Sequence, residues 1–361
     1  MEKTEKKRVV VAMSGGVDSS VAAALYKEQG HEVIGMTMQI WDYSKFDAPD
    51  GETFGTCCSL DDVYDARRVA ESLDIPFYVV NFEAHFQEMV IDPFCDDYFN
   101  GRTPNPCILC NQVLKFEILL RRARELQADW LATGHYAQII ENGGFYQLHK
   151  GIDEQKDQSY FLFTLNQEQM RMIRFPLGGL TKEEVREHAV RLGLRVAEKP
   201  ESQDICFVPD GDYVRFLEEE RGGGSLNGDI VHVSGRIVGQ HQGIYRYTIG
   251  QRKGLGISWP EPLFVVGIDV DGKQVIVGEK KHLARSDFTV YATNWSRGKP
   301  DGDMNSHCRI RYRHREVPAR VEPLPGNRAH VSLEQPQDGV RPGQAAVFYS
   351  GDEVVGGGWI E

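Results

Sequence analysis

Residues 14–20, Ser-Gly-Gly-Val-Asp-Ser-Ser, have the composition of a turn that binds phosphate. They join an apolar run, residues 9–13, to a run of helix formers, residues 21–26. The first run predicts a buried strand and the second a helix. Gly15 and Gly16 would let the backbone approach a ligand closely, and the free N–H groups of the new helix would attract an anion. The alternative is a Gly-Ser turn that only caps the helix at Asp18.

A Cys-x-x-Cys pair, Cys107 and Cys110, offers a second kind of chemistry. The prolines at 104 and 106 stiffen the approach, so we expect a helix to begin near Asn111. Cys110 would then lie near the helix N-terminus, where the dipole favours the thiolate, a nucleophile and metal ligand. The spacing alone leaves open a structural thiol pair, a redox disulfide, or half of a zinc site without a second Cys-x-x-Cys.

The remaining five of the seven cysteines carry weaker signals. Cys206 stands between Ile205 and Phe207, which on pattern alone favours a buried apolar residue. The others have no partner spacing and are interpreted as structural; they are Cys57, Cys58, Cys95 and Cys308. An odd cysteine count with no sign of secretion favours reduced thiols over disulfides.

Strands and helices alternate in the first part of the chain. Strands are expected at residues 32–38, 77–81 and 130–133, and helices at 59–73, with Ser59 as N-cap, at 111–126, at 167–173 and at 181–192. This order predicts an α/β domain with a parallel sheet covered by helices on both faces. The phosphate-binding turn and residues 133–136 would both lie beyond the carboxyl ends of strands, where such sheets bind ligands.

The pattern changes around residues 200–212, and Gly222, Gly223, Gly224 and Ser225 form a break. Residues 228–256 predict a small β-rich module. Five later runs predict an antiparallel β-barrel, at residues 288–295, 309–314, 319–323, 329–333 and 345–349. We therefore expect three domains: an α/β domain at residues 1–210, a small β-rich central module at 211–286 and a C-terminal antiparallel β-barrel at 287–361.

Composition narrows the class of protein. The 361 residues are 41% hydrophobic and 26% charged, and no apolar run approaches the length of a membrane span. The charged start does not resemble a signal peptide, so we expect a cytoplasmic protein. A net charge of −12, with acids gathered between positions 42 and 62, argues against a general nucleic-acid binder. Residues 307–315, however, carry four arginines and no acid, which suits a specific RNA contact.

The motifs together resemble a known family. Residues 14–20 lack the ending of the ordinary P-loop and the spacing of the dinucleotide fingerprint, but resemble the SGGxDS loop of the ATP pyrophosphatases (PP-loop). The whole chain resembles the bacterial tRNA-specific 2-thiouridylases, the MnmA/TrmU family. The motifs that carry this resemblance lie at residues 14–20, 102–111, 133–136, 156–161, 204–207, 248–256, 311–313 and 342–344.

The resemblance implies that ATP, with Mg²⁺, adenylates the C2 oxygen of the wobble uridine and that sulfur then replaces the oxygen. Cys206 matches the cysteine that carries persulfide sulfur, and Cys110 matches the nucleophile that helps release it. The implied ATP-binding residues are Ala12, Met13, Ser14, Gly15, Gly16, Val17, Asp18 and Ser19, with Met38 and Gly134 bordering the adenosine.

The resemblance also implies tRNA contacts. Asn105, Pro106 and Cys107 match the segment that contacts the target base, which must leave its stack. Other matching positions are His135, Lys156, Asp157, Gln158, Arg311, Tyr312 and Gln344. Simpler interpretations are a core histidine at 135, a turn at 156–159 and a solvated face at Arg311 and Arg313. The expected partners are the tRNAs for Lys, Glu and Gln, and a sulfur-donor protein of the desulfurase or relay type, or inorganic sulfide.

One position departs from the family pattern: Cys107 stands where many members carry Asp. The acid/base role of that Asp cannot be transferred to a thiol. Three thiolates, Cys107, Cys110 and Cys206, could instead hold a [4Fe-4S] cluster with one open iron. Persulfide relay and cluster chemistry thus both remain open.

Two other functions compete. A PP-loop ligase or amidotransferase for a small molecule would explain the turn, but not the cysteine pair or the basic barrel. A non-catalytic tRNA-binding protein with a nucleotide-binding fold would bind ATP without turnover. Formation of AMP that depends on tRNA separates the three.

Overall fold

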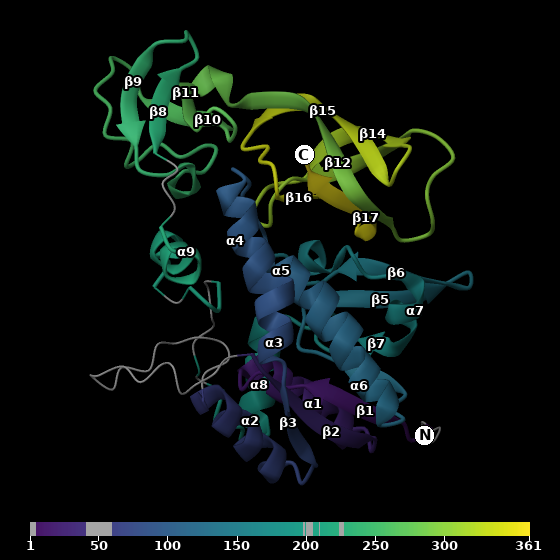
Figure 1. The fold of residues 1–361 in the computed structure, drawn as a ribbon. Helices are drawn as coiled ribbons and strands as arrows, with labels where there is room; N and C mark the ends of the chain where they lie inside the picture. Colours follow the sequence, from purple (N-terminus) through teal and green to yellow (C-terminus); the bar gives the residue numbers. More distant parts are fainter. Residues whose placement is uncertain (1–4, 41–59, 198, 200–204, 209, 224–226) are drawn as a thin grey trace. The chain divides into compact units, whose positions relative to one another are not determined.

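A computed structural model of the chain describes residues 5–40, 60–197, 199, 205–208, 210–223 and 227–361. Its contacts divide the chain into two compact units (Figure 1). The first unit consists of Met1–Val90, Cys107–Gly211 and Asp352–Val354, and the second of Ile91–Pro106, Asp212–Gly351 and Val355–Glu361. Some sequence expectations fall outside the described residues: the N-cap Ser59, Cys57, Cys58, the acids between 42 and 52, Asp204, Gly224 and Ser225.

The first unit contains a five-stranded sheet in the order β3-β2-β1-β4-β7. Its strands are β1 (Arg8–Ala12), β2 (Glu32–Gln39), β3 (Phe77–Asn81), β4 (Trp130–Ala132) and β7 (Ile173–Arg174). Each neighbouring pair is parallel. Val9, Val10 and Val11 are fully buried, so both faces of β1 are covered, as parallel sheets require. The predicted α/β class is confirmed.

Helices connect these strands. They are α1 (Val17–Glu28), α2 (Leu60–Ser72), α3 (Glu83–Phe86), η2 (Gln87–Ile91), α5 (Pro106–Leu109), η3 (Cys110–Leu119), α6 (Leu120–Glu125), η4 (Ser159–Leu162), α7 (Gln167–Met172) and α8 (Lys182–Arg191). Small buried side chains on α1, α2 and α8, including Ala23, Ala66 and Ala189, pack in one core with Val9 and Val11. No helix in the described ranges is long and apolar enough to cross a membrane.

A hairpin that the sequence analysis did not predict follows β4. It consists of β5 (Ala137–Asn142) and β6 (Phe145–Lys150), and Glu353 and Val354 pair with β6. Gly143 and Gly144 form its turn with φ of 61° and 83°, a backbone region that favours glycine. The Asn-Gly-Gly sequence was therefore the available signal for this hairpin.

The central part of the second unit joins two helices to a small sheet. The helices are α4 (Asp92–Phe99) and α9 (Tyr213–Arg221), and Tyr98 stacks on Tyr213 with ring centroids 4.6 Å apart. The sheet has the order β10-β11-β8-β9. Its elements are β8 (Gly228–His232), β9 (Ile237–His241), η5 (Ile244–Arg246), β10 (Leu263–Asp269), β11 (Gln274–Glu279) and η6 (Lys280–His282).

The remaining strands of the second unit form the predicted barrel. They are β12 (Ala284–Trp295), β13 (Met304–Arg309), β14 (Val317–Leu324), β15 (Arg328–Asp338), β16 (Ala345–Ser350) and β17 (Glu353–Ile360). They follow the order β12-β15-β14-β13-β16-β17, and β12 also pairs with β17, which closes the barrel. Its core contains Val290, Val321, Val331 and Phe348.

The strand expected at residues 309–314 is wrong. β13 ends at Arg309, and the following residues turn toward β14, whose Val317 pairs with Cys308. An ion pair of 2.6 Å between Arg309 and Glu316 joins the two ends of this turn. The arginine-rich stretch is therefore a connecting loop rather than a strand.

Candidate active site

The predicted phosphate-binding turn lies between β1 and α1. Gly15 has a φ of 72°, and a Cβ built there would come within 2.1 Å of the Asp62 carbonyl oxygen in α2. A Cβ built on Gly134 would come within 2.8 Å of the Ser19 backbone nitrogen. Both glycines are thus required by close backbone approach. Because β1 and β4 are neighbouring parallel strands, the turn and Gly134 lie at the same sheet edge.

The serines of the turn bond to its own backbone. Ser19 Oγ accepts from Ser14 N–H at 3.1 Å and donates to Gly16 O at 3.2 Å. Ser20 is fully buried and donates to the same carbonyl at 2.8 Å. Ser14 is exposed. The hydroxyl of Ser20 therefore shapes the turn, whereas Ser14 is accessible to a ligand.

Asp18 of the turn is held by a lysine that the sequence analysis missed. Lys182 Nζ lies 2.7 and 2.9 Å from the two Asp18 carboxylate oxygens, and Tyr136 OH donates to Asp18 at 2.7 Å. The Lys182 side chain is only 11% exposed. Thr181 caps α8 through a capping box with Glu184, and this fixes Lys182 at the first helical position. The sequence analysis predicted a helix at residues 181–192, but nothing local marked Lys182 as a site residue.

A second lysine, Lys199, contacts the same turn. Its Nζ donates to Gly15 O at 3.2 Å and lies 2.6 Å from both Asp62 and Asp65 of α2. The two carboxylates and the carbonyl thus share one ammonium. Lys199 therefore ties the phosphate-binding turn to the first turns of α2.

The Cys107–Cys110 helix starts earlier than predicted. Pro106 is the first residue of α5, because proline fits the first helical position, where its missing N–H costs no hydrogen bond. Cys107 is therefore in the first turn, and Cys110 opens the wide helical segment η3. The argument that the helix N-terminus favours the Cys110 thiolate does not hold for this geometry. Cys107 is exposed and Cys110 is half-buried, and residues three apart lie on the same side of a helix.

Cys206 is half-buried, and its neighbour Phe207 packs edge-on against Phe86, with centroids 5.7 Å apart. Cys95 and Cys308 are fully buried; burial raises the pKa of Cys95 to about 11 and raises that of Cys308 further. Both of these buried cysteines are free thiols. Cys95 and Cys308 thus have the environment of structural residues.

The cluster expectation concerns the arrangement of three of these thiols. Within the described residues, which include Cys107, Cys110 and Cys206, no three His, Cys, Asp or Glu side chains are grouped to hold a metal ion. The [4Fe-4S] cluster therefore stays a prediction. The same search gives no carboxylate cage for Mg²⁺, which commonly binds through nucleotide phosphates and water instead.

The residues expected to contact tRNA in the first unit line the loop before η4. Asp157 is buried and accepts from the backbone N–H groups of Gly151 and Ser159. Gln158 Oε1 accepts from Tyr136 N–H at 3.0 Å, and Lys156 is half-buried. These contacts fix the loop beside the strand edge that carries Gly134.

His135 is buried beside the same edge. It shares a hydrogen bond of 2.6 Å with Thr133 Oγ1. Burial, together with the charge of Lys115, holds the pKa of His135 well below its usual value, so the ring is neutral. This environment favours the interpretation of His135 as a core histidine.

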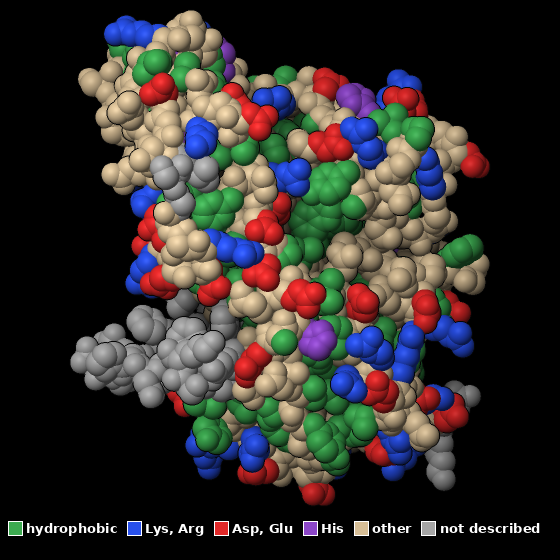
Figure 2. Space-filling view, viewed as in Figure 1, with side chains coloured by type: hydrophobic (Ala, Val, Ile, Leu, Met, Phe, Trp, Pro, Cys, Tyr) green, Lys and Arg blue, Asp and Glu red, His purple; other side chains and the backbone are tan. Residues whose placement is uncertain are grey.

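In the second unit, the side chains of the arginine-rich loop differ in their exposure to solvent. Arg313 and Arg315 are exposed, whereas Arg311 and Tyr312 are half-buried. Arg309 lies over the Tyr349 ring at 4.9 Å. Lys/Arg and Asp/Glu side chains are interspersed on the face shown in Figure 2.

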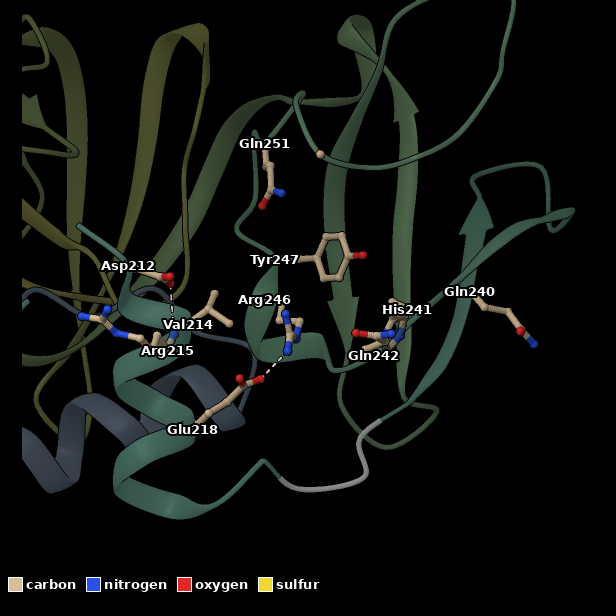
Figure 3. A pocket seen from close by; sticks show the side chains of 11 residues that line it. Asp212, Val214, Arg215, Glu218, Gln240, His241, Gln242, Arg246, Tyr247 and Gln251 are labelled. Carbon is tan, nitrogen blue, oxygen red and sulfur yellow. Dashed lines mark hydrogen bonds and ion pairs between the residues drawn. The ribbon is translucent and has the colours of Figure 1, made fainter. Parts of the chain in front are cut away.

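A cavity of about 600 Å³ lies between α9 and the β9–η5 segment of the second unit (Figure 3). Its lining includes Arg215, Gln240, Gln242 and Tyr247. Several polar side chains of the lining bond to other groups of the protein: Arg246 forms an ion pair with Glu218, and His241 forms hydrogen bonds with the backbone of Gly243 and Lys273. Its polar, partly basic wall is compatible with an RNA contact.

Comparison with known proteins identifies the family. Three family models match: a tRNA methyl transferase HUP domain at residues 7–210, a tRNA methyl transferase PRC-barrel domain at 215–279 and an aminomethyltransferase β-barrel domain at 285–360. The tRNA-specific 2-thiouridylase MnmA of Geobacter metallireducens is 62% identical over 100% of this chain and 98% of its own length. The chain belongs to the MnmA family. It is therefore an enzyme of tRNA modification.

Other relatives agree with this assignment. The MnmA proteins of Geotalea uraniireducens and Carboxydothermus hydrogenoformans are 60% and 48% identical over the whole of this chain and cover 96% and 99% of their own lengths. The models' descriptions mention methyl transfer, whereas the relatives that match from end to end are named for thiolation. Among solved structures, a 4-thiouridine synthetase aligns with 59% of this chain and 50% of its own at 20% identity and a TM-score of 0.37, too low for a conclusion.

Proposed function

We propose that this MnmA-family enzyme converts the wobble uridine of tRNA to 2-thiouridine at the expense of ATP, releasing AMP and pyrophosphate. The observation that supports this most is the glycine turn with its Asp18–Lys182 pair, in a chain that matches tRNA-specific 2-thiouridylases from end to end. The proposed substrates are the tRNAs for Lys, Glu and Gln, and the proposed location is the cytoplasm.

The proposal assigns a separate role to each of three domains. They are a catalytic PP-loop domain at residues 1–210, a central module that contacts tRNA at 211–286 and a tRNA-binding barrel at 287–361. The bounds of the three family-model matches support this division. The polar cavity beside α9 and the exposed Arg313 and Arg315 support tRNA contacts by the second and third domains.

The first step activates uridine. The residues proposed to bind ATP are Ala12, Met13, Ser14, Gly15, Gly16, Val17, Asp18 and Ser19, with Met38 and Gly134 beside the adenosine. The uridine O2 attacks the α-phosphorus, the bond to the β-phosphate breaks, and pyrophosphate leaves with its electron pair while the N3 proton passes to solvent. Backbone N–H groups and Lys182 would stabilise the developing charge, and Mg²⁺ would enter with the phosphates.

The second step transfers sulfur. A donor protein of the desulfurase or relay type supplies Cys206 with a persulfide. Its outer sulfur attacks C2, the C2–O bond breaks, and AMP leaves. The Cys110 thiolate then attacks Cys206 Sγ, which breaks the S–S bond and leaves the sulfur on C2. The Cys110–Cys206 disulfide that results must be reduced before the next turnover by a dithiol or by two thiol molecules, which leave as a disulfide.

The tRNA contacts proposed for this reaction come from several segments. Asn105, Pro106 and Cys107 would contact the target base, and Lys156, Asp157, Gln158, Arg311, Tyr312 and Gln344 would contact the rest of the tRNA or fix the loops that do. His135, which is buried and neutral, would act by supporting the edge that carries Gly134.

The test uses protein purified without oxygen, with tRNA, ATP and a persulfide donor. Mass analysis of tRNA nucleosides measures 2-thiouridine, and AMP is measured in parallel. Pyrophosphate is measured as well. We expect Cys206→Ser to release pyrophosphate but to form neither AMP nor 2-thiouridine, and Cys110→Ser to release AMP once without forming 2-thiouridine. We expect Cys107→Asp to keep thiolation without bound iron. Cys95→Ala, which removes a buried thiol in the second unit, is the control for loss of a cysteine.

Four results would contradict the proposal. AMP formation that does not need tRNA would favour a small-molecule ligase. Nucleotide binding without turnover would favour a tRNA-binding protein. Full thiolation by either serine variant would show that Cys110 and Cys206 do not have the proposed roles. Loss of both iron and activity in Cys107→Asp would show that sulfide bound to an iron–sulfur cluster, rather than a persulfide, supplies the sulfur.

A further inference from the structure

The turn before β16 holds the segment that leads to the cysteine helix. Gln344 Nε2 donates to the carbonyl oxygens of Thr103 and Pro104, at 2.8 and 3.2 Å. Thr103 N–H donates in return to Pro342 O at 2.8 Å. Three hydrogen bonds thus join two stretches that are far apart in sequence, and all of these residues belong to the second unit.

The backbone of this turn is shaped for the contact. Gly343 has a φ of 87°, and a Cβ built there would lie 3.0 Å from both Arg102 Cβ and Thr103 N. Any other residue would push the two stretches apart. On its other side the turn is fixed to the barrel, because Gly343 N–H donates to Ile360 O and Ile360 N–H donates to Gln344 O.

The neighbouring residue is also held. Arg102 pairs with Asp97 at 3.7 Å, and its guanidinium lies 5.9 Å from the centre of the Tyr291 ring on β12. Arg102 N–H donates to Asp97 O at 2.8 Å. The segment 102–104 is therefore fixed to α4, to β12 and to the turn before β16 before it reaches Asn105.

We propose that Gln344 is a positioning residue for the reaction: it sets the path of the backbone that enters the Asn105–Cys107 segment. This inference rests on the proposed function, in which that segment contacts the target base. Two prolines at 104 and 106 stiffen the chain between the hydrogen bonds and Cys107, so a shift at Thr103 is passed on to the cysteine helix.

The chemistry of the amide adds a second part to the proposal. Only the amide nitrogen of glutamine can donate to two carbonyls, so the orientation of Gln344 is fixed and Oε1 is the group it can offer to a ligand. That oxygen accepts, and a 2′-hydroxyl or an exocyclic amine of tRNA donates. Gln344 thus links tRNA on the barrel to the position of the base-contacting segment.

Two substitutions separate positioning from a simple tRNA contact. Gln344→Glu keeps the shape and the acceptor oxygens but loses both donors, and Gln344→Met loses donors and acceptor. Gln335→Met, at an exposed position on β15, is the matched control. For Gln344→Glu we expect the single-turnover thiolation rate at saturating tRNA to fall about 10- to 100-fold, because small misplacements of reacting groups cost that much.

The affinity for tRNA distinguishes the roles. If Gln344 positions the segment, the dissociation constant of Gln344→Glu stays within about twofold of wild type while the rate falls. Hydrogen exchange of the Thr103 amide should quicken in both variants and in Gly343→Ala, but not in Gln335→Met. This measurement needs no turnover, so it tests the positioning role even if thiolation is not the reaction.

A normal thiolation rate in Gln344→Glu and Gln344→Met would overturn the proposal. So would unchanged exchange at Thr103, or a weaker affinity for tRNA with an unchanged rate at saturation. In the last case Gln344 would be a tRNA contact only.

Discussion

At the scale of single residues, the Asp18–Lys182–Tyr136 group decides the charge beside the phosphate-binding turn. A carboxylate alone at this position would repel the phosphates of ATP. With Lys182 Nζ within 3 Å of both oxygens, the pair is neutral, and the ammonium faces the turn together with Asp18. The ion pair thus makes an acidic residue compatible with an anionic ligand.

Removing the ammonium should affect both stability and chemistry. We expect Lys182→Met to lower the tRNA-dependent release of pyrophosphate by about 100- to 1,000-fold, the usual effect of losing one charge-stabilising group. It should also lower the free energy of unfolding by about 1–3 kcal/mol, less than a fully buried pair would cost, because Asp18 keeps partial access to water.

A double variant makes this test specific. In Asp18→Asn/Lys182→Met no charge is left unpaired, so the free energy of unfolding should recover while pyrophosphate release stays low. Lys27→Met, at the exposed end of α1, is the matched control. Pyrophosphate release at the wild-type rate in Lys182→Met would show that the pair is only structural.

His135 gives the first unit a predictable response to acid. Its pKa is held well below the unfolded value of about 6.5, mainly by burial, so the unfolded chain binds the proton more readily than the folded one. The stability from the neutral ring is therefore fully present above about pH 6.5 and is lost as the pH falls below it, by at most about 1.4 kcal/mol per pH unit.

This loss can be isolated by comparison. Urea unfolding at about pH 7.5 and pH 5.5 should show a larger loss of stability for the wild-type protein than for His135→Gln, which has no proton to gain. His307→Gln, at an exposed position on β13, should lose as much as the wild type. Equal losses in the wild type and His135→Gln would mean that His135 is charged in the folded protein.

At the scale of elements, local sequence signals predicted what is local. The β1–α1 turn and helix α8 depend on neighbouring residues, and both were predicted. Lys182 and Lys199 were not, because their partners Asp18 and Gly15 lie 164 and 184 positions away in sequence. In the sequence, a lysine that faces solvent cannot be distinguished from a lysine of the site, because only the folded chain brings the site lysine to its partner.

The missed strand β17 has a different cause. Its run of glycines at 356–358 lacks the side chains that mark a strand, yet a Cβ at Gly356 would lie 2.6 Å from the Trp295 ring and one at Gly358 would lie 2.9 Å from Tyr291 O. Glycine is needed there because β12 approaches closely where the barrel closes. Close packing against β12 requires glycines in β17, and these glycines replace the side chains by which the sequence would have indicated a strand.

At the scale of the whole molecule, an acidic protein must bind an acidic polymer. A net charge of −12 opposes tRNA at long range, so binding must come from local basic groups whose charges are not already paired to acids. The loop between β13 and β14 has this property at Arg313 and Arg315, which are both exposed, whereas the neighbouring Arg309 is taken up by Glu316.

We therefore expect Arg313→Ala/Arg315→Ala to weaken tRNA binding by about tenfold and to flatten its salt dependence. Each lost phosphate contact should lower the slope of log affinity against log salt by about 0.7–0.9, so the double variant should lose about 1–2 units of slope. Arg328→Ala removes an exposed barrel arginine that is paired with Glu361 and should change neither quantity. Filter binding over a range of salt concentrations measures both.

If affinity falls but the slope stays at its wild-type value, the two arginines support the shape of the loop rather than contact phosphate. If neither changes, the loop is a solvated face and the tRNA binds elsewhere on the enzyme.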